Sequence, residues 1–320
     1  MAQHFLLSAQ ARTMSLKAIY KAGEEAAYEA FKSMRWAGTD GEAVCPRCGC
    51  IETYDIATRR KFKCKACYHQ FSVTSGTIFA SRKMDFTDLL AAIFLFVNSS
   101  KGKSAVQMSR ELDVQYKTAW VLCHKLREAM QGEYENATVS GEVEIDGAYF
   151  GGHVKPANKR EDRKDRRLAE NQNGQRRSVI VIRERKGRTL TFVTKTEAQG
   201  VQHANDRVAP GSVLFADEAR HWDGLARKFD MGRINHQEAY SLNGNSTNMA
   251  ESFFSRLRRM VRGQHHFVSP KYLYQYANHA AWLEDHREED NGALVGRTVS
   301  AAMSAPVSRA FKGYWQRGAA

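Results

Sequence analysis

Two carboxylates lie within separate apolar segments of the sequence. Asp146 is in the middle of residues 141–152, GEVEIDGAYFGG, and Asp217 lies near the end of residues 212–218, SVLFADE. Both segments predict strands in which an acid lies among apolar residues. Because a buried carboxylate is costly without a partner, each acid should meet a cation, a hydrogen-bond donor or a metal.

A third carboxylate, Glu251, lies in residues 248–262, NMAESFFSRLRRMVR, which predict a helix. At 100° per residue, its apolar face is formed by Phe253, Leu257, Met260 and Val261. The other face carries Glu251, Ser255, Arg258 and Arg262. A charged stripe is usually a solvated surface, so this helix alone is weak evidence for catalysis. The two acidic strands strengthen that interpretation.

Three carboxylates from separate elements suit Mg²⁺ or Mn²⁺, which are hard ions that prefer oxygen ligands. Two such ions, roughly 3.5 to 4 Å apart, could activate a water or a 3′-hydroxyl and stabilise the leaving oxygen during in-line displacement at phosphorus. We therefore expect catalytic Mg²⁺ (or Mn²⁺) at Asp146, Asp217 and Glu251, and cleavage or transfer of a phosphodiester.

The composition is compatible with a nucleic-acid partner. The 320 residues carry a net charge of +13 and have a pI near 9.5, which favours binding to a polyanion. No apolar run is long enough to cross a bilayer, and Phe5, Leu6 and Leu7 are too short a run for the core of a signal peptide. We expect a cytoplasmic protein, in which cysteines favour metal or redox use over disulfides.

Four cysteines have the spacing of a zinc ribbon. Two CxxC pairs, separated by fifteen residues, are formed by Cys45, Cys48, Cys64 and Cys67. Such pairs supply the four thiolates of a closed, structural Zn²⁺ tetrahedron, and the metal would contribute on the order of 10 kcal/mol to folding. Redox pairs or incidental cysteines are the alternative. Cys50 and His69 are not needed as ligands, and Cys123 is expected to be a buried small hydrophobe.

Three helices are predicted after the ribbon, at 85–98, 103–112 and 116–131. The break at Asp113 and Val114 suits a helix-turn-helix whose second helix faces a DNA groove. The side chains expected at DNA are Gln115, Tyr116, Lys117, Thr118 and Lys125. Helix trios are also common in proteins that never contact DNA.

Residues 155–177 hold nine Lys or Arg residues, four acids and few large apolar residues. This composition predicts an exposed loop. The loop is either a solvated insertion or a clamp on the DNA backbone.

The remaining pattern predicts a mixed sheet. A hairpin is expected at 177–184 and 188–196, a helix near 199–208, a short helix at 221–229 and a fifth strand at 233–241. With the two acidic segments, this order gives an α/β fold of the ribonuclease-H-like class with a mixed five-stranded sheet. The expected divisions are an N-terminal helical segment (1–40), a zinc ribbon (41–80), a helix-turn-helix region (81–135), a catalytic domain (140–290) and a C-terminal tail (291–320), which the sequence leaves unassigned.

From residue 25 to 290 the chain resembles insertion-sequence transposases of the IS1595 type, with an ISXO2-like transposase domain. The resemblance rests on the ribbon and on SGTIF at 75–79, KTAW at 117–120, EIDGAYFGG, FADE, INH at 234–236 and TNMAESFFSRLRR at 247–259. These motifs are far more specific together than singly.

The resemblance implies a DDE site in which Asp146, Asp217 and Glu251 hold two Mg²⁺ ions. It places a basic residue of the family on Arg258, where many relatives have Lys. Some related groups have Asn at the third position, so Asn248, one turn before Glu251, is a further candidate. Glu218 and His236 are candidates for supporting roles, or they are ordinary surface or hydrogen-bonded residues.

The implied activity is cleavage at a transposon end, followed by transfer of the new 3′-hydroxyl to target DNA. The expected partners are terminal inverted repeats and target DNA, with a homo-oligomer on the DNA and association with a bacterial nucleoid. Arg258 and Arg262 would contact the DNA. Two alternatives are a non-catalytic DNA-binding regulator and a ribonuclease-H-like nuclease that does not join strands.

One more helix is predicted at the end of the catalytic domain. Ser269 and Pro270 have the residue types of an N-cap and a first helical position, so the helix should begin there.

Overall fold

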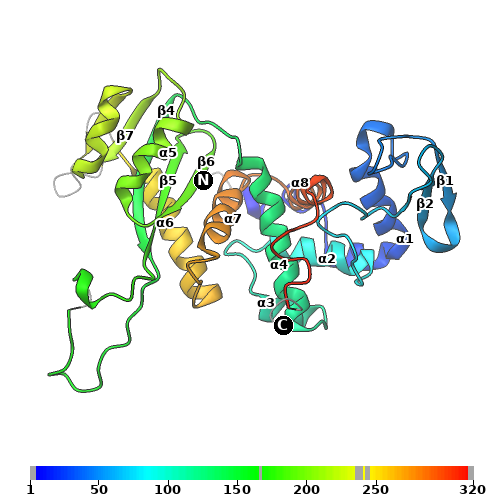
Figure 1. Ribbon diagram of the computed structural model, residues 1–320, viewed down its shortest axis with the longest axis horizontal. Coiled ribbons are helices and arrows are strands. Elements are labelled where there is room, and N and C mark those ends of the chain that lie inside the picture. Colours follow the sequence, from blue (N-terminus) through cyan, green and yellow to red (C-terminus); the bar gives the residue numbers. More distant parts are fainter. Residues whose placement is uncertain (1–4, 166–167, 235–240, 242–245, 316–320) are drawn as a thin grey trace. The chain divides into compact units, whose positions relative to one another are not determined.

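The structure is a computed structural model that describes residues 5–165, 168–234, 241 and 246–315 (Figure 1). It divides into two compact units. The first unit is formed by two separate segments, Met1–Glu133 and His286–Ala320, and the second unit is Tyr134–Asp285. No helix in the described part of the chain is both long and apolar enough to cross a membrane.

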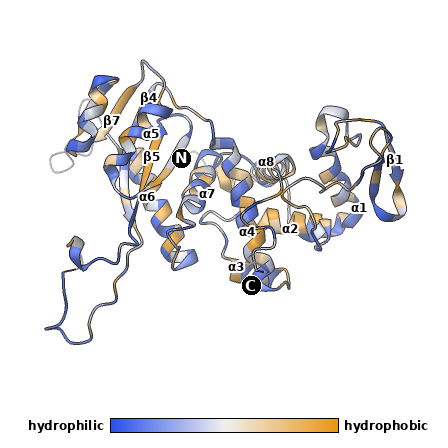
Figure 2. Ribbon diagram, in the orientation of Figure 1, coloured by the Kyte–Doolittle hydropathy of each residue, from blue (hydrophilic) through white to orange (hydrophobic). Residues whose placement is uncertain are grey.

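The second unit is built on a mixed five-stranded sheet, as predicted. Its strands are β4 (Glu142–Phe150), β5 (Arg177–Glu184), β6 (Thr189–Thr194), β7 (Val213–Asp217) and β8 (Asp230–Ile234). Their order is β6-β5-β4-β7-β8. β4 and β6 pair antiparallel with β5, whereas β4–β7 and β7–β8 are parallel. Strand β5 is buried along most of its length, and Figure 2 shows its apolar colouring.

Helices accompany the sheet. They are the 3₁₀ turn η6 (Glu197–Gln199), α5 (Gly200–Arg207), the 3₁₀ segment η7 (Arg220–Arg227), α6 (Asn248–Arg259) and α7 (Leu273–Asp285). One face of β4 and β5 packs on α6 and α7, with Ala148, Val181 and Phe253 in a shared core. The predicted apolar face of α6 is therefore confirmed as the packing face.

Three boundaries differ from the sequence prediction. Strand β8 begins at Asp230, three residues early, and most of the predicted strand beyond Ile234 lies outside the described residues. Helix α6 gives way at Met260 to a π-helix, η8 (Met260–His265). Because a π turn holds more residues than an α turn, Arg262 is rotated away from the stripe that a regular helix predicts.

Helix α7 begins at Leu273 and not at Pro270. The backbone N–H groups of Tyr272 and Leu273 donate to the carbonyls of Ser269 and Pro270, so these residues form separate i→i+3 turns ahead of the helix. The expected cap at Ser269 is wrong for this reason.

In the first unit a short 3₁₀ turn, η1 (Phe5–Leu7), is followed by α1 (Leu16–Arg35), which is capped by the Ser15 hydroxyl. A three-stranded antiparallel sheet follows, made of β1 (Thr53–Ile56), β2 (Lys61–Cys64) and β3 (Gln70–Phe71). The three predicted helices are α2 (Phe86–Val97), α3 (Ala105–Glu111) and α4 (Tyr116–Gln131). Helix α2 is apolar on nearly all sides and is correspondingly buried (Figure 2).

The C-terminal residues, left unassigned as a tail, include a helix of the first unit. Helix α8 (Asn291–Ser304) is capped by Asp290, whose side chain accepts from the N–H groups of Gly292 and Ala293. It packs against α1, α2 and α4, and Val295 and Val299 are fully buried. The side chain of Asn291 also accepts hydrogen bonds from the backbone near the start of the chain, at Thr13 and Met14.

Candidate functional site

The sheet brings Asp146 and Asp217 to neighbouring positions. The parallel register pairs Ile145 of β4 with Ala216 of β7, so the next residue on each strand is an acid. Both side chains are partly buried. Asp146 accepts a hydrogen bond from the N–H of Gly147 at 2.7 Å, and Asp217 accepts one from the N–H of Ala219 at 3.1 Å. Among the described residues, no Lys or Arg forms an ion pair with either acid.

A buried glutamate fixes the third acid's helix to the same strand. Glu144 of β4 is 1 % exposed, and its Oε2 accepts from the N–H groups of Met249 and Ala250, at 2.8 and 3.1 Å. These are N–H groups of the first turn of α6, which have no partner within the helix. Glu251 lies in that turn, so Glu144 determines where its backbone sits beside β4. The sequence analysis did not identify Glu144.

Contacts with a buried ion pair also hold α6 against β5 and α7. Arg183 of β5 donates to the carbonyl of Met249 at 3.0 Å and pairs with Glu284 of α7 at 2.6 Å. Arg256 of α6 contacts the same carboxylate. Arg183 and Glu284 are 4 % and 5 % exposed, so their charges are compensated within the unit rather than by solvent.

The neighbouring acids affect the ionisation of Asp146. Burial raises the pKa of Asp146 to about 7, and the negative charges of Asp217, Glu197 and Glu251 add to this rise. The N–H of Gly147 partly opposes it by stabilising the carboxylate. An aspartate surrounded by like charges suits a cation as its partner, because a cation would relieve both the burial cost and the repulsion.

Glu197 is an acid of this group that the sequence analysis missed. It begins the turn η6 after β6, and a capping box of Thr196 and Gln199 fixes that turn. A Cβ atom at position 147 would lie 2.5 Å from the Cγ atom of Glu197, so glycine there makes room for the glutamate. Burial raises the pKa of Glu197, as does Asp217, while His221 and Arg176 lower it. The one available signal was Gly147 itself, a glycine within a strand.

The other predicted site residues differ in how far they are exposed. Asn248 is exposed at the first position of α6, whereas Glu251, one turn later, is partly buried. Arg258 is exposed on the same helix, with its guanidinium 5.8 Å from the ring of Phe254. Arg262 is exposed in η8 and Glu218 just after β7. His236 lies outside the described residues.

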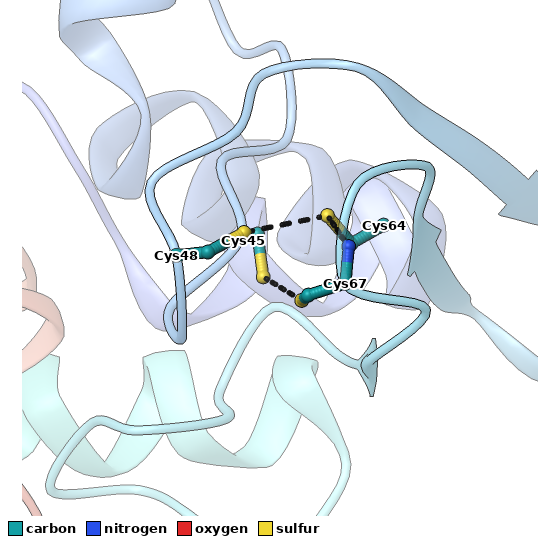
Figure 3. A group of neighbouring side chains, drawn as sticks. All are labelled: Cys45, Cys48, Cys64 and Cys67. Atoms are coloured by element: carbon teal, nitrogen blue, oxygen red, sulfur yellow. Dashed lines mark hydrogen bonds between the residues drawn. The ribbon is translucent and has the colours of Figure 1, made fainter.

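The carboxylates are less tightly gathered than the cysteine thiols. In the described chain, the group of three or more potential ligands whose donor atoms all lie within 4.8 Å of one another consists of Cys45, Cys48, Cys64 and Cys67 (Figure 3). The predicted zinc cluster is thus brought together by the fold.

Two backbone knuckles present these thiols. In the first, the N–H of Gly49 donates to the carbonyl of Cys45; in the second, the N–H of Tyr68 donates to that of Cys64. The N–H of Cys67 also donates to the sulfur of Cys64 and lowers its pKa to about 6. Four converging thiols fit a tetrahedral Zn²⁺ site.

The nearby residues considered as substitute ligands lie outside this cluster. Cys50 directs its thiol to the carbonyl of Glu52, and the ring of His69 stacks on Phe71. Cys123, in contrast, is buried in α4, as predicted for a small hydrophobe.

Helices α3 and α4 are joined by a tight turn in which Asp113 has φ of 49°. At the start of α4, the candidate side chains Gln115, Tyr116, Lys117 and Thr118 are all exposed. Lys125 is different: burial lowers its pKa, and it lies further along the helix. The exposed set is therefore concentrated at the N-terminal end of α4.

The segment after α8 covers part of α4. The ring of Trp120 lies 5.7 Å from that of Phe311 and 4.7 Å from that of Tyr314. The ammonium of Lys117 is 5.2 Å from the ring of Trp315. A candidate DNA contact thus lies beside an aromatic side chain from the C-terminal segment.

The basic loop leaves the second unit between β4 and β5. Figure 1 shows it extending well away from the sheet of its unit. Most of its described residues are exposed, as the composition predicted. Its base is tied to the unit by Arg176, whose guanidinium lies 4.2 Å from the ring of Tyr149.

Comparison with known proteins assigns both motif regions. Residues 138–285 match the ISXO2-like transposase domain, and residues 22–70 match the transposase zinc-ribbon domain. An uncharacterized protein in transposable element ISH50, from Halobacterium salinarum, is 23 % identical over 266 residues, which cover 79 % of this chain and 88 % of that protein. No solved structure matches the chain. The chain therefore contains a transposase zinc ribbon at residues 22–70, followed by an ISXO2-like transposase domain of the IS1595 type at residues 138–285.

Proposed function

We propose that the second unit cleaves and joins DNA strands with a DDE-type two-metal site. The observation that carries this proposal is the register of β4 and β7, which puts Asp146 beside Asp217. Glu251 approaches the pair on a helix that Glu144 fixes to β4. The strand order β6-β5-β4-β7-β8 also supports a ribonuclease-H-like fold.

The donor set fits Mg²⁺ or Mn²⁺. Asp146, Asp217 and Glu251 supply carboxylate oxygens, the ligands that these ions prefer, and two ions at such a site activate the attacking oxygen and stabilise the leaving one. Among the residues at the site, Glu251 is favoured over Asn248 as the third ligand. Its charge raises the pKa of Asp146, and its side chain is partly buried, whereas Asn248 is exposed.

The basic residues near the acids would hold the substrate. Arg258 presents a planar guanidinium on the exposed side of α6, where it can bind a phosphate through two parallel hydrogen bonds. Arg262 would contact the backbone of the DNA, in the different orientation that η8 gives it.

The first unit would bind the terminal inverted repeats. The exposed side chains at the start of α4, the preceding α3 and the turn between them support a helix-turn-helix, with the ribbon as a second contact. Zn²⁺ held by the four cysteines would be structural because four thiolates leave no open position. Synapsis of two transposon ends requires a homo-oligomer on the DNA.

Strand cleavage and joining on a duplex that carries the flanking inverted repeat tests the proposal. The duplex is incubated with Mg²⁺ or Mn²⁺ and with wild type, Asp146→Asn, Asp217→Asn, Glu251→Gln, Glu197→Gln or Asn248→Ala. We expect the first three variants to lose both reactions by at least about a thousandfold while DNA binding is retained, because each removes a ligand of the ions. Glu197→Gln should lower the rate less, because Glu197 packs against Gly147 and is not one of the three proposed ligands.

The controls separate the alternative functions. Repeat binding by wild type with no cleavage in either ion would indicate a regulator, and cleavage without joined products would indicate a nuclease. A wild-type rate in Asp217→Asn would contradict the proposed site outright. Asn248→Ala should remain active if Glu251 is the third ligand.

A further inference from the structure

A groove lies at the C-terminal end of β6, the edge strand of the second unit's sheet. It has a volume of about 1020 Å³ and is bounded by α5 and by residues at and just before the start of α7. Its lining includes Arg177, Lys195, Gln202, His203 and Tyr274. No Asp or Glu from the described residues lines it, so the groove combines polar groups with an unbalanced positive charge.

The two cations of the groove face each other across the hairpin. Ser178 pairs with Thr194 in the register of β5 and β6, which places Arg177 opposite Lys195. Like charges opposite one another destabilise a strand pair. Arg177 donates only to backbone carbonyls, at Gly174 and Arg176, and neither cation forms an ion pair with a carboxylate of the described chain. An anion placed between them would remove this repulsion.

Other arginines of the same hairpin show a different arrangement. Arg183 pairs with Glu284, and Arg185 pairs with Glu144 and with Glu142. The fold thus neutralises Arg183 and Arg185 with carboxylates, whereas Arg177 and Lys195 are available to bind an anion. Unpaired cations in a concave surface are suited to binding an external polyanion.

The turn η6 connects the groove to the group of acids. Ala198 and Gln199 of its lining directly follow Glu197, which packs against Gly147 beside Asp146. Since β6 is two strands from β4, roughly 10 Å separates the groove from the strand of Asp146. Arg177 pairs with Phe150, four residues beyond Asp146 on β4, and a nucleic-acid strand can span the distance from the acids to the groove within a few nucleotides.

We propose that this groove binds the sugar-phosphate backbone of the DNA strand that flanks the reacting phosphate, with Arg177 and Lys195 each neutralising one phosphate. The inference rests on the proposed DNA chemistry of the acids and adds the path that the substrate takes over the second unit. His203, whose ring stacks on Phe192 with centroids 4.2 Å apart, forms a rigid part of the lining.

The test measures how DNA binding depends on salt. Full-length Arg177→Gln, Lys195→Gln and the double variant are compared with wild type on a duplex carrying the flanking repeat. Loss of two phosphate contacts should lower the slope of log K against log salt by about 1.8 and raise Kd about tenfold. Lys186→Gln is the matched control, since Lys186 is an exposed cation at the opposite end of the same hairpin.

Crosslinking identifies the occupant independently. With p-benzoylphenylalanine in place of Gln202, we expect light-induced crosslinks to the DNA strand beside the cleaved phosphate, and none from position 186. An unchanged salt slope in the double variant would refute the proposal. Crosslinks to a second protein chain alone would also refute it, because they would show a peptide strand added to the β6 edge.

Different results would refute the groove as a DNA-binding surface and the proposed catalytic function. If Asp146→Asn abolishes cleavage while the double variant keeps the wild-type slope, the groove is not the DNA path and the chemistry stands. If the slope falls in a protein that shows no cleavage with either ion, the groove binds DNA and the proposed chemistry is wrong.

Discussion

Asp146 is buried among other acids, and its protonation should therefore affect folding. Its pKa is about 7 in the folded chain, well above the ordinary value of 3.8 for an aspartate. Only well below pH 3.8 is the carboxyl protonated in both the folded and the unfolded state. Between these values the unfolded chain has released the proton while the folded chain retains it, so the free energy of unfolding falls as pH rises.

We predict that Asp146→Asn stabilises the protein at pH 8 in buffer without Mg²⁺ or Mn²⁺. The gain should be roughly 1 to 4 kcal/mol, because one pKa unit corresponds to about 1.4 kcal/mol. Urea denaturation of the second unit, followed at pH 4 and pH 8, measures it. The advantage should disappear at pH 4, and an equal gain at both pH values would show that the effect is not due to ionisation.

The sequence identified Asp146, Asp217 and Glu251 as candidates because each acid interrupts a pattern that otherwise predicts core or a packed helix. It could not identify Glu144 or Glu197. Glu144 is one of two glutamates flanking Val143. Only the packing of α6 on β4 shows that Glu144 is buried while Glu142 is exposed. Glu197 reaches the site through a turn whose direction depends on how η6 packs on Gly147.

At the scale of elements, α6 is held to β4 by Glu144. We predict that Glu144→Gln destabilises the second unit by about 2 to 4 kcal/mol, because it weakens acceptance from two helix N–H groups and leaves Arg185 without its buried partner. Strand cleavage should fall as well, since the position of Glu251 depends on this anchor. Thermal unfolding and the cleavage assay measure both effects.

Glu142→Gln is the matched control for this prediction. Glu142 pairs with the same Arg185, at 3.4 Å, but its side chain is 61 % exposed. An exposed ion pair contributes less than about 1 kcal/mol, so this variant should be close to wild type. Equal losses in the two variants would contradict an anchoring role for Glu144.

The three-stranded sheet of the first unit should depend on its metal. We predict that a Zn²⁺ chelator, or Cys64→Ser, unfolds β1–β3, since structural zinc contributes on the order of 10 kcal/mol to small modules of this kind. Trp36 packs on Phe62 with ring centroids 5.3 Å apart, so its fluorescence should report the change. Cys50→Ser should retain zinc and the wild-type spectrum, and a spectrum that is insensitive to zinc removal would contradict the assignment.

At the scale of the whole chain, the first unit needs residues from both ends. We predict that Val299→Asp in α8 destabilises this unit by more than about 3 kcal/mol, because it buries an unpaired charge against α1, α2 and α4. Hydrogen exchange should accelerate in α1 and α4, with β4–β7 unchanged. Gly296→Ala, in the same helix, meets no atom within 4 Å and should be neutral or stabilising by up to about 1 kcal/mol.

Most of the elements were predictable from sequence, because apolar periodicity and cysteine spacing are local signals. The five strands, the ribbon and helices α2 to α4 all follow from such patterns. The role of α8 was not predictable, since its small residues give a weak pattern and its partners α1, α2 and α4 lie about 160 residues or more away in the chain. The π-helix at Met260 also lacks a local signal: its sequence continues the helical pattern.

The division of the first unit between the two ends of the chain has a consequence for synthesis. A ribosome that has translated as far as Asp285 has produced the ribbon, helices α1 to α4 and the whole second unit, but not α8. The core of the first unit is then open along the surface that α8 covers. If the first unit binds transposon ends as proposed, we expect that nascent chains, and fragments that lack α8, do not occupy those ends.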